Sequence, residues 1–205
     1  MSELVLLRHG ATDWSASGKH TGRTDVPLNE DGERQAELVG DSVRGRTFVL
    51  VLTSPLARAR RTAELAGLHD LAVDDNLQEW DYGGYEGLTT AQIRQARPGW
   101  TLWLDSVTPH ADGRPGETAG DVGARAERVI ARVLPVLQSG DVALVSHGHF
   151  LRVLAARWLG LPPTEGALLA LDTGTVSALG FEHAQPVVRL WNEQPARTTR
   201  YRAAT

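Results

Sequence analysis

Three short apolar runs stand out along the chain, at residues 3–8, 47–53 and 141–146. Continuous apolar runs of this length are typical of strands that are covered on both faces of a parallel sheet. A weaker run at 71–74 predicts a short strand. The runs at 173–181 and 186–191 predict a closing hairpin or edge pair.

Helical segments alternate with these strands. Ser54 precedes Pro55 in the order typical of a helix start, and Gly67 follows the expected helix as a stop. Thr89 predicts the cap of a shorter helix that Pro98 ends. A long helix is expected to continue through Pro135. The predicted helices cover residues 29–44, 54–66, 89–97, 118–138 and 150–159, and the predicted loops cover 9–27, 79–87 and 106–116.

The alternation of strands and helices predicts an α/β protein, a three-layer sandwich whose mostly parallel central sheet is flanked by helices. No linker, internal repeat or low-complexity tract divides the 205 residues. We therefore expect a single domain over residues 1–195, followed by a flexible tail at 196–205.

Composition excludes several classes of protein. Lys and Arg number 21 against 25 Asp and Glu, a net charge of −4 that argues against binding nucleic acid. The absence of Cys excludes disulfides, thiolate metal sites and a cysteine nucleophile. No run approaches the ~20 apolar residues of a membrane span, and the N-terminus lacks a signal-peptide pattern. We expect a cytoplasmic protein without membrane contact, and the strand pair near Pro186 would offer an edge for a homodimer.

Chemistry-bearing residues follow the ends of the strongest strands. Arg8-His9-Gly10 follows the first, Ser54 to Arg58 follows the second, and Ser146-His147-Gly148 ends the third. Because open parallel sheets bind ligands beyond the carboxyl ends of their strands, these residues are expected to share one pocket. Two imidazoles and two guanidiniums are the groups needed to hold a phosphoryl group and attack it.

Four ordered motifs now carry a family resemblance. They are Leu6-Leu7-Arg8-His9-Gly10, Ser54-Pro55-Leu56-x-Arg58-x-x-x-Thr62-Ala63, Leu77-x-Glu79-x-x-x-Gly83-x-x-Glu86-Gly87 and Val145-Ser146-His147-Gly148. The four motifs occur in this order over residues 4 to about 155. In them the chain resembles the histidine phosphatase (phosphoglycerate mutase-like) superfamily. The segment Glu79–Thr90 and the later His147-Gly148-His149-Phe150 are especially similar to actinobacterial phosphatases of this superfamily, some of them broad-specificity acid phosphatases.

The resemblance implies a role for each central residue. His9 would attack phosphorus and form a phosphohistidine. Arg8, Arg58 and His147 would hold the phosphoryl oxygens. Glu79 would be the general acid and then the general base. Glu86, in the same loop, is expected to be structural.

Weaker expectations concern the rest of the pocket. Ser15 stands where the family often carries Asn, and we expect its hydroxyl to contact phosphate. Thr21-Gly22 matches a pair that lies near substrate in many members, and the Gly148 N–H is expected to donate to phosphate. His147-x-His149 also fits a zinc site, but further ligands at suitable spacing are missing. No metal or cofactor is expected, and His149 is interpreted as a residue at a helix start.

The short segment 92–103 lacks the adjacent arginines of cofactor-dependent phosphoglycerate mutases. The resemblance therefore favours a phosphomonoester hydrolase that acts on a small phosphorylated metabolite. A phosphoglycerate mutase and a non-catalytic phosphate-binding protein remain the alternatives. The 14–23 loop and the 88–117 segment are expected to select the leaving group, and Trp100 and Trp103 favour an apolar or sugar-like one.

Overall fold

A single six-stranded sheet forms the centre of the molecule in the computed structural model, which describes residues 2–195. The strands lie in the order β3-β2-β4-β1-β5-β6, and β1 to β4 run parallel, whereas β5 is antiparallel to both β1 and β6. The strands are β1 (Leu4–Arg8), β2 (Phe48–Thr53), β3 (Leu71–Val73), β4 (Asp141–Ser146), β5 (Val176–Glu182) and β6 (Gln185–Glu193). The mostly parallel sheet and the closing hairpin confirm the predictions, whereas the tail predicted at 196–205 lies outside the described residues.

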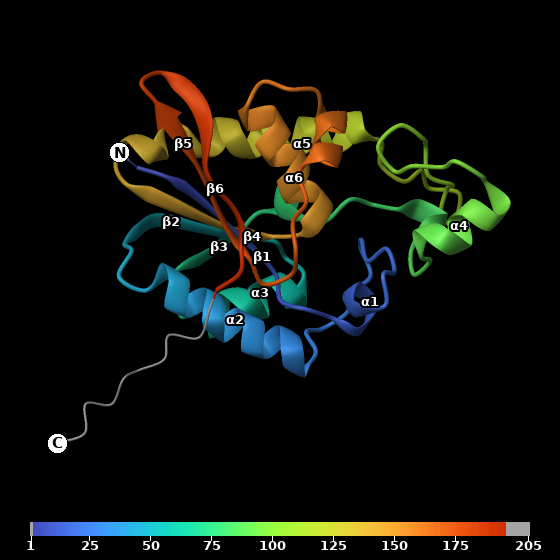
Figure 1. Cartoon of the computed structure of the whole chain (residues 1–205), viewed down its shortest axis with the longest axis horizontal. Coiled ribbons are helices and arrows are strands. Elements are labelled where there is room, and N and C mark those ends of the chain that lie inside the picture. Colours follow the sequence, from blue (N-terminus) through green and yellow to red (C-terminus); the bar gives the residue numbers. More distant parts are fainter. Residues whose placement is uncertain (1, 196–205) are drawn as a thin grey trace.

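Helices cover both faces of this sheet (Figure 1). On one face lie α2 (Glu30–Val43) and α3 (Ala57–Leu65), and on the other α5 (Ala119–Val133) and α6 (Gly148–Trp158). Strand β1 shows why two helical layers are needed. Its Leu4 and Leu6 belong to the core cluster that contains residues of α5 and α6, while Val5 and Leu7 belong to the cluster with residues of α2 and α3. Because alternate side chains of a strand point to opposite faces, an all-apolar strand requires cover on both.

Short elements gather beyond one end of the sheet. There α1 (Asp13–Ala16) and α4 (Thr90–Ala96) extend the body away from the N-terminus (Figure 1). A bridge between Lys19 and Thr89 joins the two segments. Four 3₁₀ helices complete the elements: η1 (Asp75–Leu77), η2 (Gly83–Tyr85), η3 (Val136–Gln138) and η4 (Pro163–Leu168).

Several predicted boundaries are wrong. Helix α3 begins at Ala57, after Leu56 rather than after Ser54, and Leu56 makes no side-chain cap. Helix α5 ends at Val133 and a 3₁₀ turn follows, because Pro135 lacks the N–H that would continue the helix. The predicted loops 9–27 and 79–87 contain α1 and η2. Capping at Thr89 and Thr118 is confirmed, each with a reciprocal capping box.

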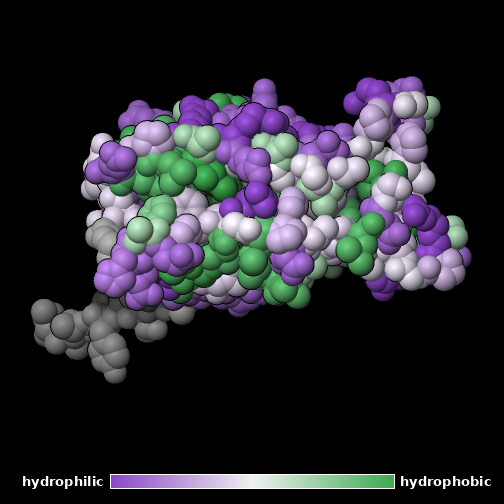
Figure 2. Space-filling model, turned by 90° about the horizontal axis from the view of Figure 1, so that it is seen from above, coloured by the Kyte–Doolittle hydropathy of each residue, from purple (hydrophilic) through white to green (hydrophobic). Residues whose placement is uncertain are grey.

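Figure 2 views the molecule from above the α5 and α6 face and shows hydrophobic groups interspersed with hydrophilic ones. Leu134, Leu161 and Leu168 are exposed large hydrophobic residues, and each follows or ends a helix. Among residues 2–195, none of the helices has the length and apolar content needed to span a membrane.

Candidate active site

His9 stands where β1 ends, and its backbone is fixed from both sides. Its N–H donates to the Ser146 carbonyl at 3.0 Å, and its own carbonyl accepts from Gly174 N–H. The ring is buried, with 4% exposed, and Nδ1 lies 2.7 Å from the Gly10 carbonyl oxygen. Since a carbonyl can only accept, Nδ1 carries the proton and Nε2 keeps a free electron pair. The geometry therefore presents His9 with its nucleophilic nitrogen available.

The surroundings of His9 favour its uncharged form. Burial lowers the pKa of His9 well below the ordinary value, and the nearby Arg58 and Arg8 cations lower it further. A neutral imidazole is the form that can attack phosphorus. The position of Gly10 helps to hold this arrangement, because a Cβ there would lie 2.1 Å from the Gly32 carbonyl oxygen at the start of α2. Gly10 N–H in turn donates to Thr62 Oγ1 on α3 at 3.1 Å.

His147 lies beside His9, with the two ring centroids 5.1 Å apart. Arg58 Nε donates to His147 Nδ1 at 3.1 Å, so Nδ1 accepts and Nε2 carries the proton, which points to Ser54 Oγ at 2.8 Å. Both ring nitrogens therefore have protein partners. His147 can contact a phosphoryl oxygen only by giving up Ser54. The Ser54 hydroxyl, interpreted from sequence as a helix cap, instead orients this histidine.

Arg58 is fully buried and anchors the loop at residues 21–24. Its guanidinium donates to the carbonyls of Thr21, Gly22 and Thr24, at 3.1, 2.8 and 2.9 Å. The Glu86 carboxylate accepts from the N–H groups of Gly22, Arg23 and Thr24 in the same loop. The loop is thus held by its carbonyls from one side and by its N–H groups from the other. Glu86 has the structural place that the sequence predicted for it.

Arg8 is the second guanidinium at the site. Its Nη1 donates to the Leu171 carbonyl, while its buried Nε has no hydrogen-bond partner. Unpaired buried donors are rare because losing water without replacing its hydrogen bond is costly. Gly148 leaves space for this side chain, since a Cβ there would lie 3.0 Å from Arg8 Cζ. Within residues 2–195, neither Arg8 nor Arg58 has a carboxylate within 4.0 Å. Two cations without a carboxylate partner, Arg58 fully buried and Arg8 half-buried, define a site for an anion.

Glu79 lies at the N-terminus of α6. Its carboxylate accepts from His149 N–H at 3.0 Å, from Phe150 N–H at 2.9 Å and from Trp80 N–H at 2.9 Å. Arg125 binds the carbonyls of residues 76, 78 and 79 and so fixes the segment that carries Glu79. Glu79 lines the same cavity as Arg8 and His9. A carboxyl group is therefore present at the site where a leaving oxygen would need a proton.

The cavity has a volume of about 260 Å³. Of the candidate site residues, Arg8, His9, Ser15, Thr21 and Glu79 line it, whereas Gly22, Arg58, His147 and Gly148 do not. However, Ser15 Oγ donates to the Thr12 carbonyl and accepts from Thr12 N–H as part of the α1 capping box. Gly22 serves close packing, because a Cβ there would lie 2.4 Å from the Trp80 carbonyl oxygen. Trp100 is buried, and Trp103 packs against Trp80 and His149. Neither tryptophan lines the cavity, and Thr90 is the residue of the 88–117 segment that does.

Sequence reasoning missed several residues of the cavity. Lys19, His20 and Thr90 line it, and His149 does so from the first turn of α6. The Lys19–Thr89 bridge that brings two of these segments together joins positions far apart in the chain, and no local pattern announces it. The described residues contain no group of three or more His, Cys, Asp or Glu side chains placed to hold a metal ion. His149 Nδ1 lies 2.7 Å from the Tyr82 hydroxyl.

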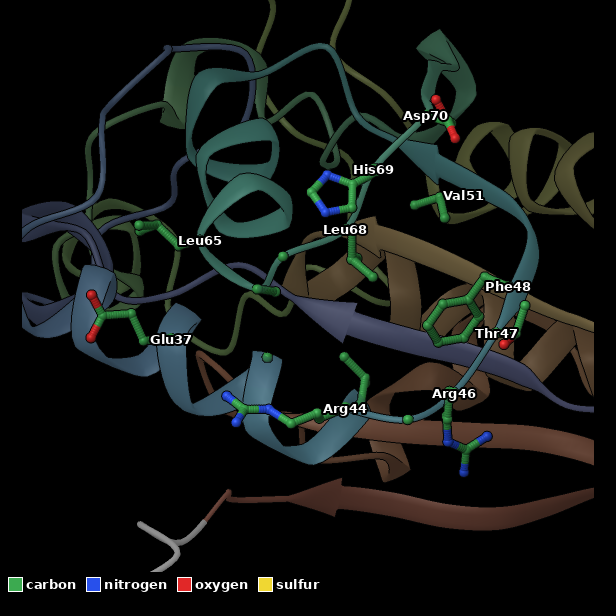
Figure 3. Close-up of a pocket in the computed structure, with 15 residues that line it drawn as sticks. Glu37, Arg44, Arg46, Thr47, Phe48, Val51, Leu65, Leu68, His69 and Asp70 are labelled. Atoms are coloured by element: carbon green, nitrogen blue, oxygen red, sulfur yellow. The ribbon is translucent and has the colours of Figure 1, made fainter.

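A larger cavity, of about 530 Å³, lies at the opposite end of β2 (Figure 3). The ends of α2 and α3 line it together with Phe48 and His69. Its two arginines are neutralised, since Arg44 pairs with Asp41, and Arg46 contacts Glu3 at 2.8 Å and Asp141 at 3.0 Å. None of the predicted site residues lines this cavity.

The site near His9 combines a neutral buried imidazole, two guanidiniums without carboxylate partners and a carboxyl group. These features define an enzyme that transfers phosphoryl groups through histidine. Residues 4–194 match the model of the histidine phosphatase superfamily (branch 1), and the chain belongs to this family.

Known proteins agree with this assignment. The chain is 45% identical to an acid phosphatase of Mycobacterium tuberculosis over 182 residues, which cover 88% of this chain and 87% of that protein. A solved structure of a Mycobacterium tuberculosis open reading frame product superposes with a TM-score of 0.86 at 41% identity, covering 95% of this chain and 99% of the other. A mycobacterial glucosyl-3-phosphoglycerate phosphatase solved with VO3 gives a TM-score of 0.80 at 31% identity, covering 94% and 99%.

Proposed function

We propose that this protein hydrolyses phosphomonoesters of small metabolites through a phosphohistidine at His9. His9 Nε2 attacks phosphorus in line, the bond to the leaving oxygen breaks, and Glu79 gives that oxygen a proton. Water then attacks the phosphohistidine and returns a proton to Glu79. The phosphorus–nitrogen bond breaks, inorganic phosphate leaves, and His9 is neutral again.

The arginines stabilise the charge that spreads over the phosphoryl oxygens during both steps. Arg8 offers the unpaired Nε, and Arg58 faces His147 and the 21–24 loop. His147 and the Gly148 N–H complete the predicted phosphate contacts, Ser15 and Thr21 line the cavity, and Gly22 packs against Trp80 behind it. The observation that carries the proposal is the neutral His9 ring placed among cations that lack carboxylate partners.

The test is hydrolysis of a panel of phosphomonoesters in excess chelator by wild type and His9→Ala. We expect wild-type turnover to persist with chelator and the variant to lose at least about 10⁴-fold, as removal of a nucleophile does in enzymes that use covalent catalysis. His69→Ala, which alters the cavity at the other end of β2, is the matched control. Full activity of His9→Ala would exclude the mechanism.

A phosphoglycerate mutase is the second candidate, because both reactions share the first half. A mutase must hold its intermediate, reorient it and exclude water. Arg8 is the only arginine that lines the described cavity, so a substrate carboxylate has no second guanidinium there. Incubation with 3-phosphoglycerate should therefore release phosphate. Formation of the 2-isomer would instead support the mutase.

A non-catalytic phosphate-binding protein needs neither His9 nor Glu79. Measurable phosphate binding without turnover of any ester would favour it.

We also propose a homodimer through the β6 edge strand, which light scattering tests directly, since a monomeric mass would refute it. The cytoplasmic location stays a prediction.

A further inference from the structure

Four side chains form a polar wall of the 260 Å³ cavity: His20, Tyr82, Thr90 and His149. They are linked in two pairs, His149 Nδ1 with the Tyr82 hydroxyl at 2.7 Å and His20 Nε2 with Thr90 Oγ1 at 3.3 Å. The His20 ring lies 4.8 Å from that of Tyr82 and 6.2 Å from that of His149, measured between centroids. The proposed chemistry of phosphoryl transfer uses none of these four groups.

Each imidazole of this polar wall keeps one nitrogen for a ligand. Within residues 2–195, His20 Nδ1 and His149 Nε2 have no hydrogen-bond partner in the protein. Burial lowers the pKa of His20 to about 4 and that of His149 well below its ordinary value. Both rings are therefore uncharged near neutral pH. A neutral imidazole nitrogen either donates or accepts, and a hydroxyl group matches both cases because it does both.

The charges of the cavity do not favour a second anionic group. Arg8 faces the phosphoryl position, the Glu79 carboxylate lines the same cavity and opposes a further anion, and the Lys19 ammonium lies over the Trp14 ring, 5.6 Å from its centroid. The remaining polar wall is neutral at the pH at which a carboxylate is ionised. The volume of about 260 Å³ lies below the roughly 300–1,000 Å³ of ligand clefts in general, which favours a small leaving group beside the phosphoryl group.

We propose that the polar wall selects the leaving group, and that the preferred substrates are phosphate esters of small uncharged polyhydroxylated alcohols. Hydroxyl groups of the alcohol bind His20 Nδ1 and His149 Nε2, while Arg8 and Arg58 hold the phosphoryl group. This inference rests on the proposed phosphatase activity and names its substrate class. An alcohol without hydroxyl groups would cover these two nitrogens without pairing them, which disfavours its binding.

Three esters of equal chain length test the proposal: glycerol 3-phosphate, propyl phosphate and 3-phosphoglycerate. For the wild-type protein we expect kcat/KM to be at least about tenfold higher for glycerol 3-phosphate than for propyl phosphate, the effect of one or two hydrogen bonds. 3-Phosphoglycerate should also fall below glycerol 3-phosphate. A wild-type ratio near one, or a preference for 3-phosphoglycerate, would overturn the proposal before any variant is made.

Variants then test whether the polar wall causes the ratio of kcat/KM for glycerol 3-phosphate to that for propyl phosphate. His149→Phe and His20→Phe keep an aromatic ring for packing and should each lower the ratio about fivefold or more. His149→Gln retains a hydrogen-bonding group and should keep most of the ratio, which separates recognition from loss of packing. His69→Phe, outside the site, is the control and should leave the ratio unchanged. Unchanged ratios in both His→Phe variants would refute the proposal. Failure of the wild type to hydrolyse any of the esters would instead refute the phosphatase activity itself.

Discussion

The two ends of β2 each carry a cavity with arginines, yet only one end has the means for phosphoryl transfer. The larger cavity, of about 530 Å³, has Arg44 and Arg46, both paired with carboxylates. The smaller one, of about 260 Å³, has Arg8 and is next to Arg58, and both lack such partners among residues 2–195. Cavity size is therefore a poor guide to chemistry here. Guanidiniums without carboxylate partners beside a neutral histidine distinguish the proposed catalytic end.

Removing one arginine from each end should give the largest contrast. Arg58→Ala is expected to lower kcat/KM about 10³-fold or more, because it removes a transition-state donor and releases both His147 and the 21–24 loop. Arg46→Ala breaks exposed ion pairs and should leave kcat/KM within about twofold. Steady-state kinetics with one phosphomonoester compares them. Equal losses in the two variants would mean that Arg58 acts only through stability.

A similar contrast applies to carboxylates. Glu86→Ala frees the three N–H groups of the 21–24 loop, so Arg58 loses its fixed position. We expect kcat/KM to fall about 10- to 100-fold, the effect of a small displacement of a catalytic group. Glu37→Ala at the other cavity is the matched control. Full activity of Glu86→Ala would show that Arg58 keeps its position without the hydrogen bonds between Glu86 and the 21–24 loop.

Two glycines should separate activity from stability. Gly148→Ala places a Cβ 3.0 Å from Arg8 Cζ and is expected to lower kcat/KM about tenfold while changing the unfolding midpoint little. Gly40→Ala places a Cβ 2.8 Å from the Ala66 carbonyl oxygen, where α2 passes the end of α3. It should lower the unfolding midpoint but not kcat/KM of the folded protein. Thermal unfolding and kinetics on both variants check this, and the reverse pattern would contradict the account.

Lowering the pH from 7.5 to 6 should have little effect on the protonation of His9. Because burial and then Arg58 and Arg8 hold the pKa of His9 well below the ordinary value of 6.5, the ring stays neutral as the pH falls through 6.5. We therefore expect no protonation of His9 between pH 7.5 and 6. Titration of the histidine ring resonances by NMR in the free protein measures this without interference from substrate ionisation, and His9→Asn assigns the signal. Protonation of His9 with a midpoint near 6.5 would contradict the predicted environment.

The same depressed pKa values of His9, His20, His147 and His149 bear on stability. Below pH 6.5 the unfolded chain binds protons at these positions and the folded protein does not. The free energy of unfolding should therefore decrease as the pH is lowered below 6.5, by about 1.4 kcal/mol per pH unit for each histidine that remains neutral in the folded protein. Denaturant titrations between pH 7 and 5 test the sign, and greater stability at pH 5 would refute it.

The sequence can indicate the end of the sheet at which the proposed site lies, because that end depends on local signals. Apolar runs identify β1, β2 and β4, and the residue after a parallel strand has a fixed place at the edge of the sheet. His9 and His147 follow directly from this rule. Arg58 follows from the β2 exit, although α3 begins two residues later than predicted.

On the leaving-group side, the sequence indicated the 14–23 loop and the 88–117 segment but not which of their residues meet. His20 and Thr90 meet through the pairing of Lys19 with Thr89 and the hydrogen bond from His20 N–H to the Leu88 carbonyl, at 2.9 Å. These contacts join loops about seventy residues apart, and loop pairing leaves no periodic pattern. The hydrogen bond between His147 Nε2 and Ser54 Oγ also depends on tertiary geometry.

The most direct test of the account is capture of the phosphorylated enzyme. A slow phosphomonoester is mixed with protein, the reaction is stopped in alkali, which preserves phosphohistidine, and the peptides are analysed by mass spectrometry. The account predicts one phosphoryl group on the peptide that contains His9, absent from His9→Ala and present in His69→Ala. Turnover without any phosphoryl group on His9, or with the label on another residue, would contradict it.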